Sequence, residues 1–303
     1  FKSMIYPITF SIPQVKILDN LDIKKEKILS NIIPNNNYSY NFHKEEDYYN
    51  EYKISMFAIT RKKAGWDCLR HYEILANGCI PLFLNIENCP KNILSLFPKN
   101  IILETNKFYY SISNKNITDL TREEITQYNK YKNLLFEYTR NNLTTISISK
   151  YILNKNNLDK CNNILFLSGN TNPDYLRCLT LHGFKSLFKN KCHDYPKIRH
   201  LYKNENIDYQ NLYGRGMTYT NLLDQSYHDD IKNLTIEIDI KQKKYDLIIY
   251  GSLHRGLPFY DLVNKTYSKN EIILLCGEDT HICDLSKFKN HNIFLREYDK
   301  FIT

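Results

Sequence analysis

Residues 61–85 hold the pattern that most restricts the fold of this chain: a basic stretch, an amphipathic helix, a glycine and a short apolar strand. Residues 67–77 have helix-forming composition, and their apolar side chains recur at helical spacing on one face. Gly78 follows and is expected to end the helix. The apolar run 79–84 then has the composition of a strand in a parallel sheet. The pattern therefore predicts a strand that follows a helix in an α/β fold.

The start of this helix is also a predicted anion-binding site. Free backbone N–H groups and the helix dipole attract negative charge to a helix N-terminus. Arg61, Lys62 and Lys63 come just before the helix and add positive charge there. We therefore expect this place to suit a diphosphate that carries a sugar or a nucleoside on either side.

The helix and the following strand carry a family resemblance. Residues 65–81 read GWDCLRHYEILANGCIP and resemble the donor-binding motif of GT-B glycosyltransferases. The closest groups are the exostosin-like and spore-maturation-type enzymes, which share an R..E.LA.G.IP pattern. In these families the acidic residue of the helix binds the donor ribose, and the helix N-terminus faces the diphosphate. The run is a small part of the chain.

The resemblance implies particular donor-binding residues. By position, Glu73 is the ribose ligand and Arg70 is a phosphate or ribose partner. The remaining predicted donor-binding residues are Arg61, Lys62, Lys63, Gly65, Trp66 and Asp67. A second interpretation stays open, in which these residues form a Rossmann-like βαβ unit that binds no nucleotide, and Arg70 and Glu73 form a surface ion pair.

Strands alternate with helices along both halves of the chain. In the second half, strands are predicted at 163–167, 245–250, 271–276 and 292–295, with a helix at 174–188. The first half opens with an alternating segment at 5–12, and strands are predicted at 55–60, 80–85 and 101–104, with a helix at 121–139. This alternation indicates parallel sheets covered on both faces. We expect an α/β protein with two Rossmann-like domains that face a central cleft, as in GT-B enzymes.

The expected domains are residues 1–157, which bind the donor nucleotide, and residues 158–303 on the acceptor side. In GT-B enzymes the donor domain normally follows the acceptor domain, whereas here the donor-type motif comes first. We therefore hypothesise a permuted order, or a chain cut from a longer tandem array. In either case the tail FLREYDKFIT and the head FKSMIYPITF would form one passage between domains.

Polar loops follow three predicted strands of the second half, where open α/β sheets bind their ligands. An inverting transfer requires a general base, and Asp279, Glu278 and His254 are the candidates. Cationic groups must also offset the charge that builds on the leaving diphosphate. The acceptor or phosphate side is predicted to include Ser168, Gly169, Arg215, Gly251, Ser252, Arg255 and His281. The alternatives left open are a solvated loop at Glu278 and Asp279, a packed His254, and a plain glycine turn around Arg215.

The net charge of +8 permits a phosphate-bearing ligand, but no dense basic tract or basic helix indicates nucleic acid. None of the eight cysteines forms a C-x-x-C motif, and no Cys/His cluster has zinc spacing. We therefore expect no metal ion and a reducing, cytoplasmic location. No run approaches the length of a membrane span, and no signal peptide is visible.

These features together favour one enzyme class. We expect a glycosyltransferase that moves a sugar from a nucleotide-diphosphate sugar to a hydroxyl of a glycan, protein or small molecule. The nucleotide sugar is a co-substrate, and no further cofactor is expected. Two alternatives are a non-catalytic nucleotide-sugar binding module and a glycosyltransferase that acts on modified nucleic-acid bases.

Overall fold

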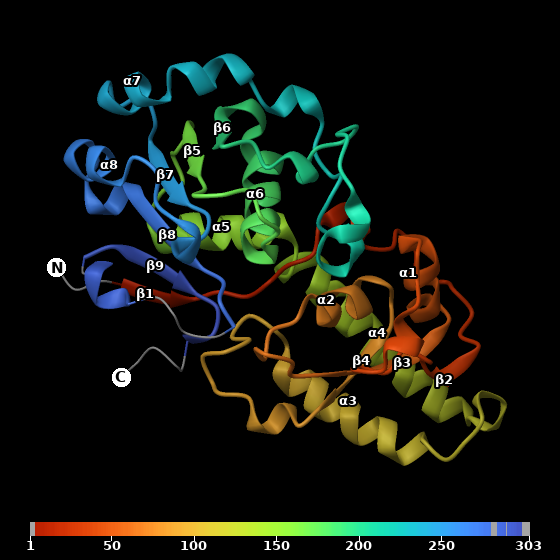
Figure 1. Cartoon of the computed structure of the whole chain (residues 1–303). Helices are drawn as coiled ribbons and strands as arrows, with labels where there is room; N and C mark the ends of the chain where they lie inside the picture. Colours follow the sequence, from red (N-terminus) through yellow and green to blue (C-terminus); the bar gives the residue numbers. More distant parts are fainter. Residues whose placement is uncertain (1–3, 280–283, 289, 299–303) are drawn as a thin grey trace.

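The chain folds around two parallel β-sheets in this computed structural model, which describes residues 4–279, 284–288 and 290–298 (Figure 1). The larger sheet has six strands in the order β1-β9-β8-β7-β5-β6, and the smaller has three in the order β2-β3-β4. Every pairing within the two sheets is parallel. The expected α/β class is confirmed, and the sheets are compatible with Rossmann-like folds.

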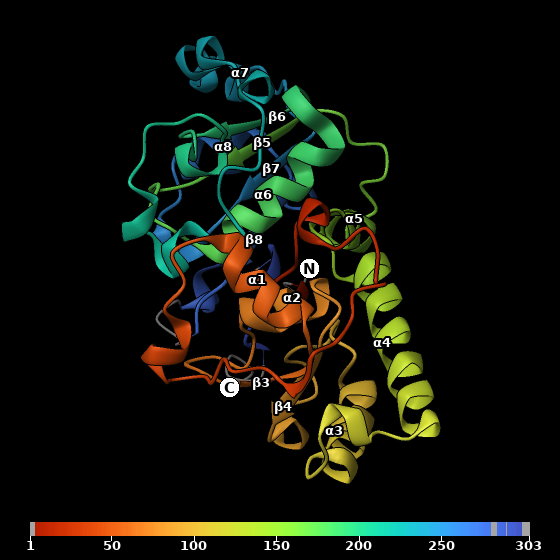
Figure 2. The same cartoon turned by 90° about the vertical axis from the view of Figure 1, so that its right-hand side faces the viewer.

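The small sheet carries the motif helix. Its strands are β2 (Lys27–Leu29), β3 (Ser55–Arg61) and β4 (Ile80–Leu84). The helices around it are α1 (Glu45–Lys53), α2 (Leu69–Ala76), α3 (Lys99–Ile112) and α4 (Arg122–Asn142). The predicted strands at 55–60 and 80–85 and the helix at 121–139 are confirmed. In Figure 2, α2 lies near the middle of the molecule, between the two sheets.

The predicted strand at 101–104 is wrong, because these residues form the first turns of α3. Ile102, Thr105 and Ile112 are the buried residues of this helix, and their spacing places them on one helical face. A short apolar run does not by itself distinguish a strand from a helix turn. The helix was missed because the three consecutive apolar residues 101–103 have the composition of a short buried strand.

The large sheet is built mainly from the second half of the chain. Its strands are β1 (Met4–Pro7), β5 (Ile164–Leu167), β6 (Cys192–Tyr195), β7 (Leu247–Tyr250), β8 (Ile272–Cys276) and β9 (Asn292–Leu295). The helices around it are α5 (Thr145–Lys155), α6 (Tyr175–Phe188), α7 (Ile236–Lys241) and α8 (Tyr260–Thr266). All four strands predicted in this half and the helix at 174–188 are confirmed.

Side chains of the large sheet pack on both faces, as the continuous apolar strands predict. Phe166 of β5 belongs to the hydrophobic cluster that includes Leu179 of α6. Its neighbour Leu165 belongs to the cluster on the other face, which includes Ile240 of α7. Successive residues of a strand point to opposite faces, so one strand contributes to both clusters.

Two elements from the first 157 residues belong with the large sheet. β1 pairs in parallel with β9, with Met4 opposite Asn292. α5 packs on α6 so closely that a Cβ atom on Gly183 would collide with the carbonyl oxygen of Thr145. The sheets therefore do not divide the chain at residue 157, because the first strand, β1, belongs to the large sheet and the strands of the small sheet come after it. The first and last strands lie side by side, and the permuted order stays a hypothesis.

The large sheet has a point where the strand order reverses. β5 lies between β6, the next strand in the sequence, and β7, the strand after that. Open α/β sheets bind ligands at the carboxyl ends of the strands that flank such a point. Here those ends lead into Ser168 and Gly169 after β5, and into Gly251 and Ser252 after β7. None of the helices in the described part of the chain has both the length and the hydropathy that a bilayer-spanning helix requires.

Candidate functional site

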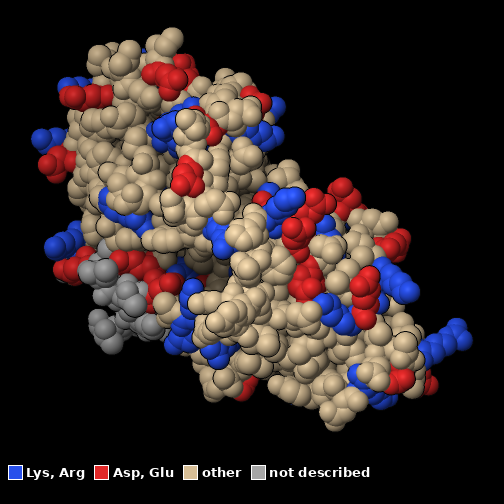
Figure 3. Space-filling model, turned by 45° about the vertical axis from the view of Figure 1, so that its right-hand side comes forward, with Lys and Arg blue, Asp and Glu red and all other residues tan. Residues whose placement is uncertain are grey.

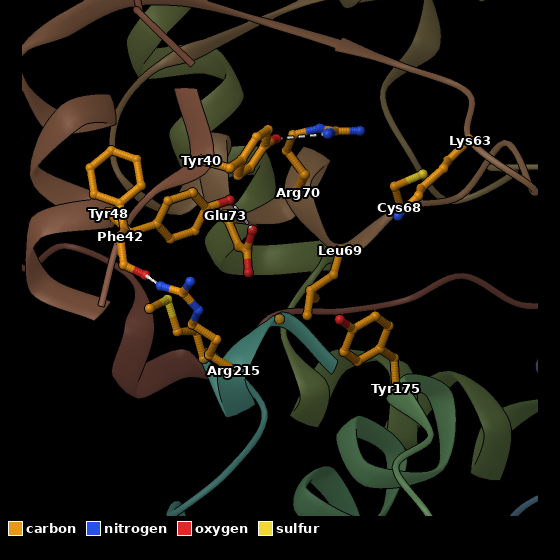
Figure 4. Close-up of a pocket in the computed structure, with 12 residues that line it drawn as sticks. Tyr40, Phe42, Tyr48, Lys63, Cys68, Leu69, Arg70, Glu73, Tyr175 and Arg215 are labelled. Atoms are coloured by element: carbon orange, nitrogen blue, oxygen red, sulfur yellow. Dashed lines mark hydrogen bonds between the residues drawn. The ribbon is translucent and has the colours of Figure 1, made fainter. Parts of the chain in front are cut away.

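A cavity of about 320 Å³ lies between residues of the small-sheet part and residues of the large-sheet part. The surface is hollowed where the two parts meet, with acidic and basic side chains around the hollow (Figure 3). The motif helix α2 contributes Leu69, Arg70 and Glu73 to the cavity lining. Tyr175 at the start of α6 and Arg215 line it from the large-sheet part (Figure 4). The motif therefore faces a cavity to which both parts contribute.

Glu73 is the buried acidic group of this cavity, with an exposed fraction of 6%. Its Oε2 accepts a hydrogen bond of 2.6 Å from the Tyr48 hydroxyl, and its Oε1 accepts one of 2.6 Å from Thr218 Oγ1. Burial raises the pKa of the Glu73 carboxyl, while the hydrogen bonds from Thr218 and Tyr48 oppose that rise. Two hydroxyl groups thus donate hydrogen bonds to a carboxylate whose charged form burial disfavours.

Arg70 is held away from Glu73 by two other partners. Its Nε donates to Thr60 Oγ1 at 3.1 Å, and its Nη1 donates to the Tyr40 hydroxyl at 2.7 Å. Its guanidinium also lies over the Tyr40 ring, 5.8 Å from the ring centroid. Because Glu73 is buried and Arg70 bonds elsewhere, the alternative of a surface ion pair between them is wrong. Figure 4 shows Arg70 and Arg215 on opposite sides of Glu73.

The start of α2 opens on the cavity. Cys68 precedes the helix at its N-cap position without a capping hydrogen bond from its side chain, and both Cys68 and Leu69 line the cavity. Lys63 lines the cavity as well, unlike Arg61 and Lys62. The predicted combination of a helix N-terminus and a nearby cation is therefore present, with Lys63 as the cation.

Three predicted donor-binding residues instead support the junction between the two parts. Asp67 is buried and accepts hydrogen bonds from the Phe10 N–H at 2.7 Å and the Tyr72 hydroxyl at 2.9 Å. Burial raises the Asp67 pKa to about 6, while Arg296 pulls it down. Gly65 packs so tightly that an added Cβ would collide with carboxylate oxygens of Glu297 and Asp279. Trp66 is buried, and the Lys62 amino group lies 5.4 Å from the centre of its ring.

The loops that follow β5 and β7 meet, and they are two of the three polar loops that the sequence marks as ligand-binding. A Cβ atom on Gly169 would collide with the carbonyl oxygen of Arg255, so these two loops touch through their backbones. Asp174, at the end of the loop after β5, holds the loop after β7, and the sequence analysis missed it as a site residue. Its Oδ2 accepts from Ser252 Oγ at 2.9 Å and from Arg255 Nε at 2.8 Å. The available signal was its position directly before a predicted helix, where an aspartate caps the first turn.

His254 lies between Ser252 and Asp174 in the loop after β7. Its Nδ1 lies 3.4 Å from Ser252 Oγ, and its Nε2 lies 3.8 Å from Asp174 Oδ2. Its side chain is 20% exposed. Burial lowers its pKa, and the negative charges of Asp174 and Glu278 only partly offset that effect. Burial therefore favours the neutral form of the imidazole.

The two carboxylates after β8 differ in environment. Glu278 is buried, and its Oε2 has no hydrogen-bond partner among the residues that the structure describes. Asp279 has a side chain that is 44% exposed and forms an ion pair with Arg296. Asp279 is therefore engaged at the junction, while Glu278 keeps an oxygen available. His281, predicted beside them, lies outside the described residues.

Arg215 was predicted on the acceptor side, but it lines the cavity together with Glu73. Its Nη1 donates to the carbonyl oxygen of Phe42, and its φ angle is 54°. The glycines at 214 and 216 also have positive φ angles, so this segment turns back sharply towards the small-sheet part. Sequence position alone assigned Arg215 to the acceptor half, whereas the turn brings it across to the donor-type helix.

No family model, curated protein or solved structure matches this chain. Function therefore has to be inferred from the geometry of the site. Within the part of the chain that the structure describes, no group of three His, Cys, Asp or Glu side chains is placed to hold a metal ion. The cavity combines aromatic walls, one buried carboxylate and the cations Lys63, Arg70 and Arg215. This chemistry suits a ligand with a flat ring, hydroxyl groups and negative charge.

Proposed function

We propose that the protein is a glycosyltransferase of GT-B-like organisation that takes its sugar from a nucleotide-diphosphate sugar bound in this cavity. The observation that carries the proposal is the position of Glu73. The motif residue that the resemblance makes the ribose ligand is buried in a cavity lined from both parts of the chain. The volume of about 320 Å³ lies at the lower end of the usual range for ligand pockets.

The chemistry of the lining supports a nucleotide. Each oxygen of Glu73 accepts one hydrogen bond within the protein, from Tyr48 and Thr218, and a carboxylate oxygen has a further lone pair to offer. Those lone pairs would accept the two hydroxyl hydrogens of a ribose. Tyr40 and Tyr175 offer ring faces for the base.

The cations of the cavity would bind the diphosphate. Lys63 and Arg70 come from the small-sheet part and Arg215 comes from the large-sheet part, so positive charge approaches from two sides. Charge-assisted hydrogen bonds from arginine to phosphate are short and strong. They would also stabilise the negative charge that develops on the diphosphate as it leaves the sugar.

For the transfer itself we assign His254 as the base. The acceptor hydroxyl oxygen would bond to the anomeric carbon while its proton passes to the neutral imidazole. The bond from the anomeric carbon to the diphosphate oxygen would break, and the diphosphate would leave with the electron pair. A single displacement of this kind inverts the anomeric centre. The negative charge of Glu278 raises the pKa of His254 and would therefore favour the imidazolium that forms.

A non-catalytic binding module remains the second candidate, because none of the proposed catalytic residues lines the cavity. Such a module would bind the nucleotide sugar and leave it intact. Release of nucleoside diphosphate from the bound nucleotide sugar separates the two functions. We also propose a cytoplasmic location, which the free thiols of Cys68, Cys79 and Cys178 support.

The donor site is tested by thermal stabilisation with a panel of nucleoside diphosphates and nucleotide sugars. A ligand at one hundred times its Kd stabilises the native state by about 2.7 kcal/mol. We expect one nucleotide family to raise the Tm of the wild-type protein, and the Glu73→Gln variant to lose that response. Glu104→Gln, an exposed substitution on α3, is the matched control and should respond like wild type. No response from wild type, or an undiminished response from Glu73→Gln, would overturn the assignment.

A further inference from the structure

A short segment of the large-sheet part reaches across to the motif helix. We call residues 213–218 the strap. The strap is tied to the small-sheet part by the bond from Arg215 to the Phe42 carbonyl and by a 3.2 Å bond from the Thr218 N–H to Glu45 Oε1. Gly214, Arg215 and Met217 of the strap line the cavity. The strap therefore forms the wall that the large-sheet part contributes beside Glu73.

Thr218 is the strap residue that touches Glu73. It is fully buried, and its φ angle of 75° is unusual for a β-branched residue. Strained conformations of this kind persist only where surrounding contacts over-determine them, and they concentrate at functional sites. The bond of 2.6 Å from Thr218 Oγ1 to Glu73 Oε1 is one of those contacts.

The Thr218 hydroxyl has a second hydrogen-bond partner, whose direction follows from the bond to Glu73. The Tyr49 hydroxyl also bonds to Thr218 Oγ1. Burial raises the pKa of Tyr49 well above its usual value, so that its hydroxyl keeps its proton. Because Thr218 has one hydroxyl hydrogen and gives it to Glu73, Tyr49 must donate to Thr218. The result is a relay of donors from Tyr49 through Thr218 to the carboxylate.

We propose that Thr218 is a positioning residue for Glu73, which it holds ionised and oriented towards the ligand from the opposite part of the molecule. Thr218 and Tyr48 each occupy one lone pair, on different oxygens of the carboxylate. The lone pairs that remain are the ones that a pair of neighbouring hydroxyls on a ligand would use. The ribose as the ligand group rests on the proposed function, whereas the effect of Thr218 on Glu73 does not.

Other groups also set the charge of Glu73. The titratable and charged groups that face it from the elements packed around it are Tyr40 before α1, Glu45, Tyr48, Tyr49 and Tyr52 of α1, Arg70 of α2, Tyr175 of α6 and Arg215 of the strap. Removing the Thr218 hydroxyl leaves all of these in place. A change in the pKa of Glu73 would then result from the lost hydrogen bond and not from a change in the surrounding charged groups.

The ligand-free protein provides the first test. Thr218→Val keeps the β-branched shape but has no hydroxyl, and Thr220→Val is the matched control. Thr220 lies two residues beyond the strap segment and donates to the Gly216 carbonyl oxygen instead of to Glu73. The carboxyl carbon signals of ¹³C-labelled glutamate residues would be titrated by NMR. The Glu73 signal is the one that is absent from the spectrum of Glu73→Gln. We expect Thr218→Val to raise the pKa of Glu73 by about one unit, because a donor to the charged form is lost.

Thr218→Ser restores the hydroxyl and should return the Glu73 pKa to the wild-type value, and Thr220→Val should not change it. If Thr218→Val fails to fold, Thr218→Ala removes the same hydroxyl with a smaller side chain. The inference is overturned if Glu73 titrates alike in wild type and in the variant without the hydroxyl.

Binding provides the second test, with the nucleoside diphosphate that stabilises wild type most as the probe. We expect Thr218→Val to weaken its Kd about tenfold at pH 7, the size of one lost hydrogen bond to a charged group. Binding should also fail at a higher pH on acidification than in wild type, since Glu73 would protonate sooner. Equal Kd values and equal pH profiles would overturn the inference. If wild type binds no nucleotide, the proposed function fails, and the titration of Glu73 still decides the role of Thr218.

Discussion

Arg296 donates from its Nη1 to the backbone carbonyl oxygen of Asp67 at 2.7 Å, and so joins the end of the large sheet to the segment that leads into the motif helix. The same buried guanidinium donates to the Gly277 carbonyl and forms the ion pair with Asp279. It also lies over the Phe10 ring, 4.3 Å from the ring centroid. One side chain thus holds the two parts of the molecule at the edge of the site.

We expect Arg296→Met to destabilise the protein by about 3 kcal/mol, because removing one member of a buried ionic cluster leaves its partners without compensation. The free energy of unfolding would be measured in urea. Arg199→Met is the control, since Arg199 forms an ion pair with Glu205 but its side chain is 59% exposed. That substitution should cost less than about 1 kcal/mol. Equal losses in the two variants would show that Arg296 does not hold the junction.

Asp67 should make stability depend on pH. Its pKa in the folded protein is about 6, compared with an ordinary value of 3.8. Between these values the folded protein holds a proton that the unfolded chain releases, so stability should fall as pH rises from about 4 to about 6. The size expected from two pKa units is roughly 2–3 kcal/mol.

The contribution of Asp67 is isolated by comparison with Asp67→Asn, which does not titrate. Urea unfolding of both proteins would be measured at pH 4.5 and pH 7. We expect the advantage of wild type over the variant to be larger at pH 4.5. A difference that does not change with pH would contradict the raised pKa.

Arg215 should contribute to affinity for phosphate but not for the nucleoside. Arg215→Met removes a cation from the cavity wall, so we expect about a tenfold weaker Kd for the nucleoside diphosphate, measured by calorimetry. The corresponding nucleoside should lose little affinity, and it reports any general damage to the strap. Lys62→Met is the control, because Lys62 lies against Trp66 outside the cavity lining. Equal losses for both ligands would refute a phosphate contact.

His254 should determine the acid side of the pH–rate profile. We expect His254→Gln to slow release of nucleoside diphosphate from the nucleotide sugar by about 10²- to 10⁴-fold, the usual contribution of a general base. The wild-type rate should fall only below pH 6.5, because burial lowers the His254 pKa and a protonated imidazole cannot accept a proton. The Kd of the nucleotide should stay unchanged. An unaltered rate in the variant would assign the base to another group.

The strands of the large sheet were predictable because they are short, continuous apolar runs. Each residue of β5, β7, β8 and β9 is buried, so local composition alone marks these strands. β6 was missed because His193 and Asp194 interrupt its apolar character. Both are buried, and Asp194 forms a buried ion pair with Lys185 of α6 at 2.9 Å. A charged partner from a distant helix is not visible in the local pattern.

The candidate site was predictable in part because three of its residues are near neighbours in the sequence. Arg70, Glu73 and Lys63 lie close together in the sequence around one helix, and the structure places all three in one cavity. Asp67 and Gly65 belong to the same motif but face the junction. Side chains three positions apart on a helix, such as Arg70 and Glu73, share a face, whereas the residues before the helix point elsewhere, and the motif does not state which direction faces a ligand.

By itself the sequence determined the local elements: the helix before Gly78, the apolar strands, and the acidic and basic residues of the motif. The tertiary structure alone decided which of these side chains share a site. Thr218 is 145 positions from Glu73, yet its hydroxyl supports the Glu73 carboxylate. Periodicity and composition report only on near neighbours along the chain. The contact between Thr218 and Glu73 joins the large-sheet part to the small-sheet part, so it arises only when the whole chain packs.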